Sequence, residues 1–193
     1  MSDPATERLS RRIGSLGRDE LRIRRAEDAD GPALTALVGA AYDEYACGPL
    51  DPRVFDADLA APARMAKESG RSWWVVVRSD PSPTLLASVA HGPLRTSVDD
   101  RGRIELHRLY LAPEVRGVGL ATCLLEGIVD EARRTGATTL IAWSDTRLPD
   151  AHRRYLAFGF RLTGERRELG DPAGTTELEF ALPLEDGPGG PAH

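Results

Sequence analysis

The stretch from Leu106 to Gly136 constrains the fold more than any other part of the chain, because two glycines there join a strand pattern to a helix pattern. The apolar run at its start ends at Pro113, and proline stops further strand pairing because it lacks a backbone N–H group. After Gly117 and Gly119, apolar residues recur every four positions, which predicts an amphipathic helix with a left-handed cap at Gly136. A strand, a glycine turn and a helix start in this order point free backbone N–H groups at an anion.

The two glycines suit a phosphate-binding turn. Without a Cβ at Gly117 and Gly119, phosphate oxygens can approach the main chain closely, and Arg116 adds a fixed cation beside the turn. An ordinary tight turn is an equally good interpretation of the Gly-x-Gly pattern alone. The pattern is neither a P-loop nor a dinucleotide-binding fingerprint, because it lacks a Gly-Lys-Ser/Thr ending and a third glycine in the required spacing.

The residues around this turn resemble a known family. The segment Arg116-Gly-Val-Gly-Leu-Ala121, which follows Leu109-Tyr-Leu-Ala-Pro-Glu114, is similar to the acyl-CoA pyrophosphate loop of the GNAT superfamily of N-acyltransferases. The pattern of that superfamily is Arg/Gln-x-x-Gly-x-Gly/Ala, and it is filled here by Arg116, Gly119 and Ala121.

A second motif supports the resemblance. Tyr155 lies four residues before Gly159-Phe160, as in the second signature of the superfamily. Two motifs in this order are far more specific than either one, and the resemblance extends over residues 21–184. It implies an α/β fold of the GNAT type, with helices on both faces of a central mixed, mostly antiparallel sheet that contains a splayed pair of cofactor-binding strands.

The resemblance also implies acetyl-CoA as the co-substrate. In proteins of this superfamily the strand before the glycine turn splays from its neighbour and leaves backbone groups free for the pantetheine arm. The N–H of the central residue of Leu109–Leu111 would then lie near the thioester oxygen. One position departs from the family pattern, because Leu148 stands where many relatives carry an asparagine. The predicted cofactor contacts are Leu109, Tyr110, Leu111, Arg116, Gly117, Val118, Gly119, Leu120, Ala121, Thr122 and His152.

Tyr155 is the predicted general acid. It matches the family tyrosine that faces the sulfur of CoA and protonates the leaving thiolate. A phenol has a reference pKa of about 10, close enough to that of a thiol for proton transfer in a favourable geometry. A core aromatic residue is the alternative interpretation, because Leu156 and Phe158 lie beside Tyr155 on the same predicted helix.

Glu105 is the predicted general base, at a place where several relatives carry a glutamate that deprotonates the amine. Period-2 alternation puts Glu105, His107, Leu109 and Leu111 on one face of their strand. Burial would have to raise the pKa of Glu105 to make it a competent base. Two alternatives stay open: His107 as the base, and Glu105 as a structural carboxylate paired with Arg103 or Arg161.

The chain is predicted to form one domain. We expect a flexible N-terminal arm over residues 1–20 with a short helix near residues 7–13, a GNAT-like domain over 21–184, and a disordered tail over 185–193. Two helices are expected over about 31–45 and 53–69, with Pro62 interrupting the second, and the resemblance implies that this region helps shape the acceptor pocket, although a solvent-exposed face is the alternative interpretation. Their candidate substrate contacts are Tyr42, Asp43, Glu44, Tyr45 and Phe55. The strands are expected over residues 21–25, 73–78, 84–91, 103–111, 138–143, from 160, and 175–182, and a further helix over 149–158.

Composition excludes several functional classes. The formal net charge of −5 argues against a general nucleic-acid binder, because phosphate binding requires positive surface. The chain has two cysteines and no paired His or Cys spacing, so we expect neither a disulfide framework nor a metal site. Without a signal peptide or a long apolar span, the protein is expected in the cytoplasm, away from membranes, and a homodimer is compatible with the sequence.

The sequence therefore predicts an acetyl-CoA-dependent N-acetyltransferase that acts on a primary amine of a small molecule. Two alternatives remain: acetylation of a protein N-terminus or lysine, which needs an open groove, and a non-catalytic acyl-CoA-binding sensor. The fold alone does not decide the acceptor.

Overall fold

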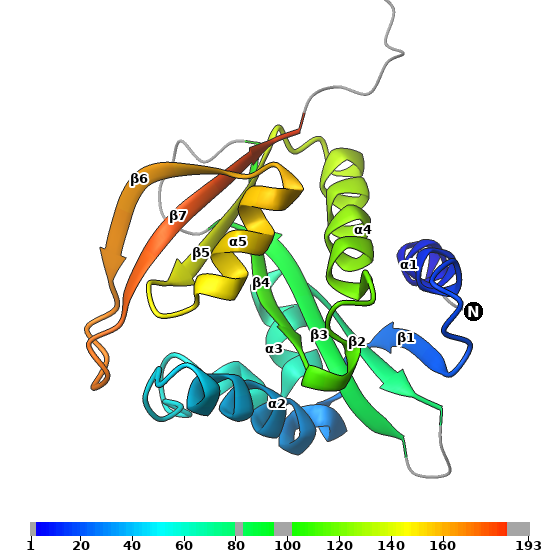
Figure 1. The fold of residues 1–193 in the computed structure, drawn as a ribbon, viewed down its shortest axis with the longest axis horizontal. Coiled ribbons are helices and arrows are strands. Elements are labelled where there is room, and N and C mark those ends of the chain that lie inside the picture. The colour runs from blue at the N-terminus through cyan, green and yellow to red at the C-terminus, as the bar shows by residue number, and fades with distance from the viewer. Residues whose placement is uncertain (1–2, 80–82, 95–101, 185–193) are drawn as a thin grey trace, which may run out of the picture.

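The computed structural model describes residues 3–79, 83–94 and 102–184 (Figure 1). Its strands form one seven-stranded sheet in the order β1-β2-β3-β4-β5-β7-β6. All neighbouring strands are antiparallel except β4 and β5, which are parallel. The predicted mixed, mostly antiparallel sheet is therefore confirmed. The strands are β1 (Leu21–Arg25), β2 (Ser72–Arg78), β3 (Thr84–Pro93), β4 (Arg103–Leu111), β5 (Thr139–Asp145), β6 (Arg161–Glu168) and β7 (Thr176–Pro183).

Helices cover both faces of this sheet. One face packs under α1 (Pro4–Gly14), α4 (Leu120–Arg134) and α5 (Pro149–Phe158), whose buried side chains share one apolar cluster with the sheet. The other face packs against α2 (Gly31–Glu44) and α3 (Pro62–Ser69), which contribute to a second cluster. Because each helix buries one apolar stripe, the sheet is the shared middle layer of an α/β/α arrangement.

The sheet opens between β4 and β5. Their parallel pairing runs only from Arg103 opposite Thr139 to Leu106 opposite Ala142, although both strands continue. Figure 1 shows the two strands diverging beyond this point, with β5, β7 and β6 on one side and β1 to β4 on the other. The later part of β4 therefore has backbone groups with no strand on its β5 side.

A bulge in β4 accompanies this opening. The register with β3 shifts between Ala90 opposite His107 and Ser88 opposite Tyr110, and Arg108 has a φ of 52°, which is rare for a residue with a Cβ. The extra residue reverses the alternation of side chains that follow it. Leu109 and Leu111 consequently pack against the cluster under α1 and α4, together with Leu106. The expectation that they share a face with Glu105 and His107 is wrong for this reason.

The glycine turn and the helix after it have the predicted form. Gly117 and Gly119 have φ values of 76° and 87°, which L-amino acids with a Cβ rarely adopt. The helix α4 begins at Leu120 and ends at Arg134, with Gly136 in the left-handed conformation (φ 78°) just behind it. These local features were predictable because they depend on residues adjacent in the chain.

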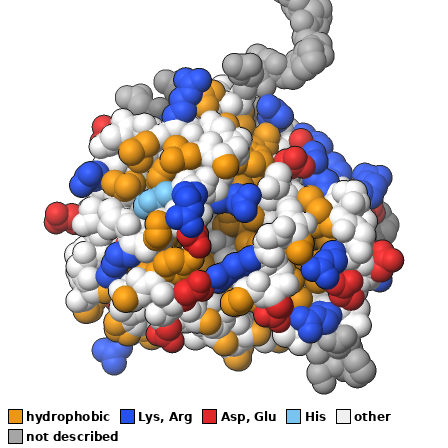
Figure 2. All heavy atoms as spheres, in the orientation of Figure 1, with side chains coloured by type: hydrophobic (Ala, Val, Ile, Leu, Met, Phe, Trp, Pro, Cys, Tyr) orange, Lys and Arg blue, Asp and Glu red, His pale blue; other side chains and the backbone are white. Residues whose placement is uncertain are grey.

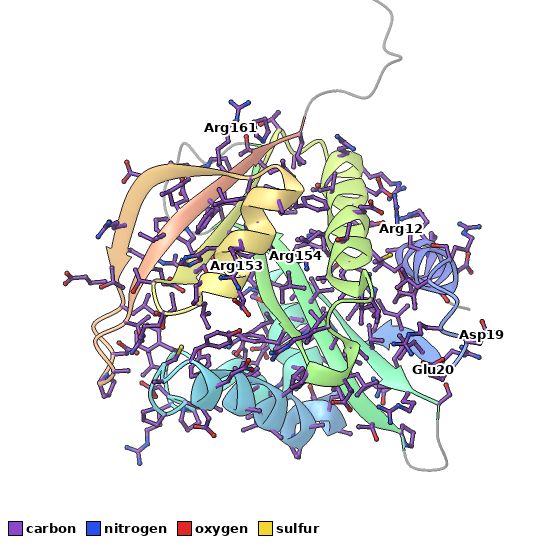
Figure 3. The ribbon with its side chains drawn as sticks, in the orientation of Figure 1. Arg12, Asp19, Glu20, Arg153, Arg154 and Arg161 are labelled. Atoms are coloured by element: carbon purple, nitrogen blue, oxygen red, sulfur yellow. The ribbon has the colours of Figure 1, made fainter. Side chains whose placement is uncertain are left out.

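The N-terminal segment differs from the expected flexible arm. Residues Pro4–Gly14 form the helix α1, with Asp3 as its N-cap, and the helix lies against α4 and β1. Leu9 and Ile13 are buried in the cluster shared with α4. Figure 3 shows Arg12 between the two helices, where it forms ion pairs with Glu126 and Asp130. The segment is ordered because its apolar stripe is covered by a distant part of the chain, which local sequence does not reveal.

Two further predictions concern the start of the second helix and the C-terminal tail. The second predicted helix is shorter than expected, since α3 starts at Pro62 and residues 57–60 form only a 3₁₀ turn. Proline is favourable in the first helical turn and unfavourable further inside, so it starts the helix here. The predicted tail over 185–193 lies outside the described residues.

Truncation of Leu9 tests whether α1 is part of the domain. Leu9→Ala should lower the free energy of unfolding by about 2–5 kcal/mol, because the side chain is 1% exposed and packs directly over Gly127. Leu162→Ala is the matched control: this leucine is 52% exposed, and its loss should change the free energy by no more than about 0.5 kcal/mol. Urea denaturation measures the free energy of unfolding of both variants. If Leu9→Ala loses no more free energy than Leu162→Ala, α1 contributes nothing to the core.

Candidate active site

Two cavities meet where β4 and β5 diverge. The first, which we call the loop cavity, has a volume of about 440 Å³ and is lined by the glycine turn, the start of α4 and α5. The second, the sheet cavity, has a volume of about 550 Å³ and is lined by β4, β5, β6 and the segment before α3. Their shared lining residues are Leu109, Tyr110, Leu148, Ala151 and Tyr155.

The loop cavity collects most of the predicted cofactor residues. Of these it is lined by Leu109, Tyr110, Leu111, Arg116, Gly117, Gly119, Ala121 and Thr122. Three others lie elsewhere. Leu120 is buried in the core, Val118 packs against the same core, and the His152 ring lies 5.0 Å from that of Phe180. Their roles in cofactor binding stay predictions.

Free backbone donors and basic side chains surround the loop cavity. The N-terminus of α4 has no side-chain cap, so its first N–H groups remain available to an anion. Arg116 is held in a two-point ion pair by Glu44, at 2.8 Å for each bond. Arg153 and Arg154 also line the cavity, and Figure 3 shows both on α5. Figure 2 shows basic and acidic side chains around a hollow near the middle of this face.

The backbone of β4 offers further groups on the open side. The N–H of Ala112 donates to the carbonyl of Leu86 on β3, over 2.7 Å. Alternation along an antiparallel ladder then points the polar groups of Tyr110 toward β3 and those of Leu109 and Leu111 toward the opening. The carbonyl of Leu111 accepts from Arg116 Nε at 3.1 Å, which agrees with this direction. The free donors are therefore the residues on either side of Tyr110, rather than the central residue that the family resemblance implied.

Tyr155 lies at the junction of the cavities. It is 7% exposed, and its ring packs against those of Phe160 and Phe180, with centroids 5.3 and 5.5 Å away. Burial, with smaller contributions from Tyr110 and Glu177, raises the pKa of its phenol above the usual value. The phenol therefore keeps its proton at neutral pH. Tyr155 therefore packs in the core and also lines both cavities.

Glu105 faces the sheet cavity, where it is 7% exposed. Burial raises the pKa of its carboxyl to about 7, although the guanidinium of Arg167, 3.6 Å away, opposes the shift. His107 Nδ1 also lies 3.6 Å from this carboxyl, and burial lowers the pKa of that imidazole well below its usual value. Arg103 bonds to Glu179 at 2.9 Å. Arg167 of β6 is thus the guanidinium that pairs with Glu105, and the charge of Arg71 also lowers the pKa of this carboxyl.

Sequence reasoning missed a buried arginine. The side chain of Arg108 is 12% exposed and bonds to Asp56 at 2.8 Å, to Asp58, and to the carbonyl of Phe55 at 2.8 Å. These contacts fasten the segment before α3 to the bulge of β4. The only local signal was the charge of Arg108 itself, in the middle of a strand. Its acidic partners, Asp56 and Asp58, lie about 50 residues earlier in the sequence, so no local pattern links them to it.

Arg167 and Trp143 were also missed. Arg167 of β6 lies over the Trp143 ring, 4.5 Å from its centroid, and binds Glu177 at 2.5 Å. All three residues line the sheet cavity. Strands β5, β6 and β7 bring them together, and no motif in the sequence links them.

The candidate acceptor contacts divide between the cavities. Tyr42 and Phe55 line the sheet cavity, and their contact with an acceptor stays a prediction. Tyr45 lines the loop cavity and donates to Asp150 at 2.7 Å. Glu44 pairs with Arg116, and Asp43 lines neither cavity.

The part of the chain that the structure describes holds neither a cluster of metal-ligating side chains nor a membrane-spanning helix. Residues 3–79, 83–94 and 102–184 contain no group of three or more His, Cys, Asp or Glu side chains arranged to hold a metal ion. In the same ranges, each helix is too short or too polar to cross a membrane.

The sequence of this chain is similar to known acetyltransferases. Residues 35–160 match the model of the acetyltransferase (GNAT) family. The chain is 26% identical over 156 residues to the L-methionine sulfoximine/L-methionine sulfone acetyltransferase of Pseudomonas paraeruginosa, a match that covers 79% of this chain and 87% of that protein. It is 27% identical over 133 residues to N-acetyltransferase 8F1 of Rattus norvegicus, over 69% of this chain but only 57% of the rat protein's length.

Solved structures have the same fold. The structure of yncA from Salmonella typhimurium, which contains its cofactor acetyl-CoA, matches with a TM-score of 0.65 and 23% identity, over 91% of this chain and 100% of that one. An N-acetyltransferase from Staphylococcus aureus Mu50 matches with a TM-score of 0.66 and 21% identity, over 86% and 99%. Together with the family model, these matches confirm the family and fold that the two motifs predicted.

The raised pKa of Glu105 predicts how stability depends on pH. Between its reference value of 4.5 and about 7, the folded protein holds a proton that the unfolded chain has lost. The free energy of unfolding contributed by this group therefore falls as the pH rises through that interval. Glu105→Gln lacks the ionisation, so its free energy of unfolding relative to wild type should rise between about pH 5 and about pH 8. Urea denaturation of wild type and Glu105→Gln at both pH values measures their difference in free energy of unfolding. If this difference is the same at the two pH values, the pKa of Glu105 is not raised.

Proposed function

As a member of the acetyltransferase (GNAT) family, the chain is an acetyl-CoA-dependent N-acetyltransferase, and we propose that its acceptor is the primary amine of a small molecule. The observation that carries this proposal is the meeting of two cavities at Tyr155, one beside an anion-binding loop and the other beside a buried carboxyl. An acyl transfer site needs these two compartments, because cofactor and acceptor must reach one point from different directions.

The loop cavity fits the cofactor. Gly117 and Gly119 have positive φ and are exposed, and the first N–H groups of α4 have no side-chain partner, so phosphates can bind directly to the backbone. Arg153 and Arg154 supply positive charge near the same loop. Acetyl-CoA brings an acetyl group already activated as a thioester. The backbone groups of Leu109 and Leu111 would hold its pantetheine arm and donate to the thioester oxygen.

Glu105 and Tyr155 divide the proton transfers in this proposal. Glu105, with a pKa raised to about 7, accepts a proton from the acceptor ammonium, directly or through a water molecule. The resulting neutral amine is the nucleophile. Tyr155, kept protonated by burial, donates its proton to the departing sulfur. The hydrophobic packing around its ring holds the hydroxyl at the junction of the cavities, which a general acid requires.

Two observations favour a small acceptor. The sheet cavity is lined by Val54–Asp58 before α3 and by Leu169 and Glu177 of the β6–β7 hairpin, and its volume of about 550 Å³ suits a small molecule. The relative from Pseudomonas paraeruginosa is named for the acetylation of two small amino-acid derivatives. An assay of CoA release with acetyl-CoA and a panel of small amines, peptides and protein N-termini tests the proposal. Turnover of peptides alone would overturn it.

A substitution at Gly119 tests the cofactor loop. Gly119→Ala should weaken CoA binding about tenfold or more, because a residue with a Cβ disfavours the φ of 87° that directs the first N–H groups of α4 toward the phosphates, and the added Cβ would lie 3.2 Å from the side chain of Leu16. Gly136→Ala is the matched control, since Gly136 also has a positive φ but lies at the other end of α4. Both variants place a Cβ at a strained positive φ, but only the first should lose affinity in calorimetric titration with CoA. Equal affinities would contradict the loop assignment.

A conservative substitution tests the general acid. Tyr155→Phe keeps the ring packing and removes the phenol proton, so kcat should fall by about two to four orders of magnitude. The affinity for CoA, measured by calorimetry, should remain within about threefold of wild type and thus controls for misfolding. An unchanged rate, under conditions where the chemical step limits turnover, would leave Tyr155 as a core residue only.

A further inference from the structure

The mouth of the sheet cavity carries exposed apolar side chains. Val54 is 66% exposed and Phe55 is 37% exposed, and both line this cavity. Among the described residues, only Leu156 and Leu162 are other large apolar side chains of comparable exposure, and neither lines the sheet cavity. Neighbouring exposed apolar groups at a cavity mouth are more informative than single ones scattered over a surface.

The segment that presents them is held in a fixed shape. Asp51 accepts from the N–H groups of Arg53 and Val54, at 3.1 and 3.2 Å, and the Asp56 side chain accepts from the N–H of Asp51 at 2.8 Å. The backbone N–H of Asp56 also donates to the carbonyl of Asp51, over 2.8 Å. These bonds close a small ring of backbone and carboxylates. Val54 and Phe55 are therefore exposed in an ordered turn.

A buried ion pair anchors this turn beside the reaction site. Arg108 of β4 binds the carboxylates of Asp56 and Asp58 and the backbone carbonyl of Phe55. Arg108 follows His107 directly and occupies the bulge at which β4 turns toward the cavity junction. The apolar side chains thus have a defined position relative to Glu105 and Tyr155, which is what selection between substrates requires.

The inner part of the same cavity has the opposite character. Its charged lining residues comprise four carboxylates and three guanidiniums, which leaves about one negative charge when Glu105 is ionised. These residues are Asp56, Asp58, Arg71, Glu105, Arg108, Arg167 and Glu177. Such a lining matches one ammonium group better than the several charges of a polyamine. The cavity is therefore polar and weakly anionic inside, and apolar at its mouth.

We propose that the acceptor is a primary amine with a single positive charge and an apolar substituent, which packs against Val54 and Phe55 while its ammonium group lies toward Glu105. This inference rests on the proposed function and adds the substrate class. Burial of the substituent supplies binding energy, because each methylene removed from water contributes about 0.8 kcal/mol. The turn needs no rearrangement to receive it, since its own hydrogen bonds already fix its shape.

A homologous series of substrates tests this proposal. We expect kcat/KM to rise about three- to fourfold per added methylene from ethylamine to hexylamine, with phenylethylamine among the better substrates and spermidine among the poorer. In Phe55→Ala the increase per methylene should fall to less than twofold, because half of the apolar mouth is removed. Leu162→Ala is the matched control, since this exposed leucine lies on β6 outside the cavity lining, and its series should coincide with that of wild type.

The possible outcomes separate the two proposals. If wild type acetylates all the amines with equal kcat/KM, or prefers spermidine, the apolar substituent is overturned and the acetyltransferase assignment stands. If Phe55→Ala keeps the full increase per methylene, Val54 and Phe55 are not the contact and the inference is also overturned. If no small amine is acetylated although CoA binds, the proposed function itself fails, and the inference fails with it.

Discussion

The early end of pairing between β4 and β5 is the constraint on which the rest of this structure depends. The strands share hydrogen bonds only as far as Leu106 and Ala142. Beyond that point their edges are free, so the sheet itself supplies the opening that other folds form with loops. Both cavities border this opening, and their shared residues lie along it. A fully paired sheet would leave no free backbone group on the later part of β4 and would close the opening that both cavities border.

The bulge at Arg108 determines what faces that opening. It shifts the alternation of β4, so that Glu105 and His107 lie on the acceptor side while Leu109 and Leu111 join the core beneath α4. It also puts a guanidinium among buried carboxylates, where an unpaired charge would be strongly unfavourable. Asp56 and Asp58 neutralise it, and this pairing attaches the segment before α3 to β4.

Burial has opposite consequences for the protonation of Tyr155 and Glu105 at neutral pH. The apolar rings of Phe160 and Phe180 surround Tyr155, and loss of hydration keeps its phenol neutral. Glu105 is buried to a similar extent, but Arg167 limits the rise of its pKa, so the carboxyl can ionise near neutral pH. One group is thereby kept as an acid and the other becomes available as a base. The same desolvation lowers the stability of the folded protein as the pH rises through the ionisation of Glu105.

The features that depend on neighbouring residues follow from the amino-acid sequence alone. The glycine turn, the helix α4 and the spacing of Tyr155 from Gly159 were predictable, because positive φ requires glycine and helical periodicity is local. Only the tertiary structure decided that α1 packs on α4, that a bulge reverses the faces of β4, and that Arg167 rather than Arg103 or Arg161 approaches Glu105. Each of these depends on contacts between segments far apart in the chain, whose partners local propensity does not specify.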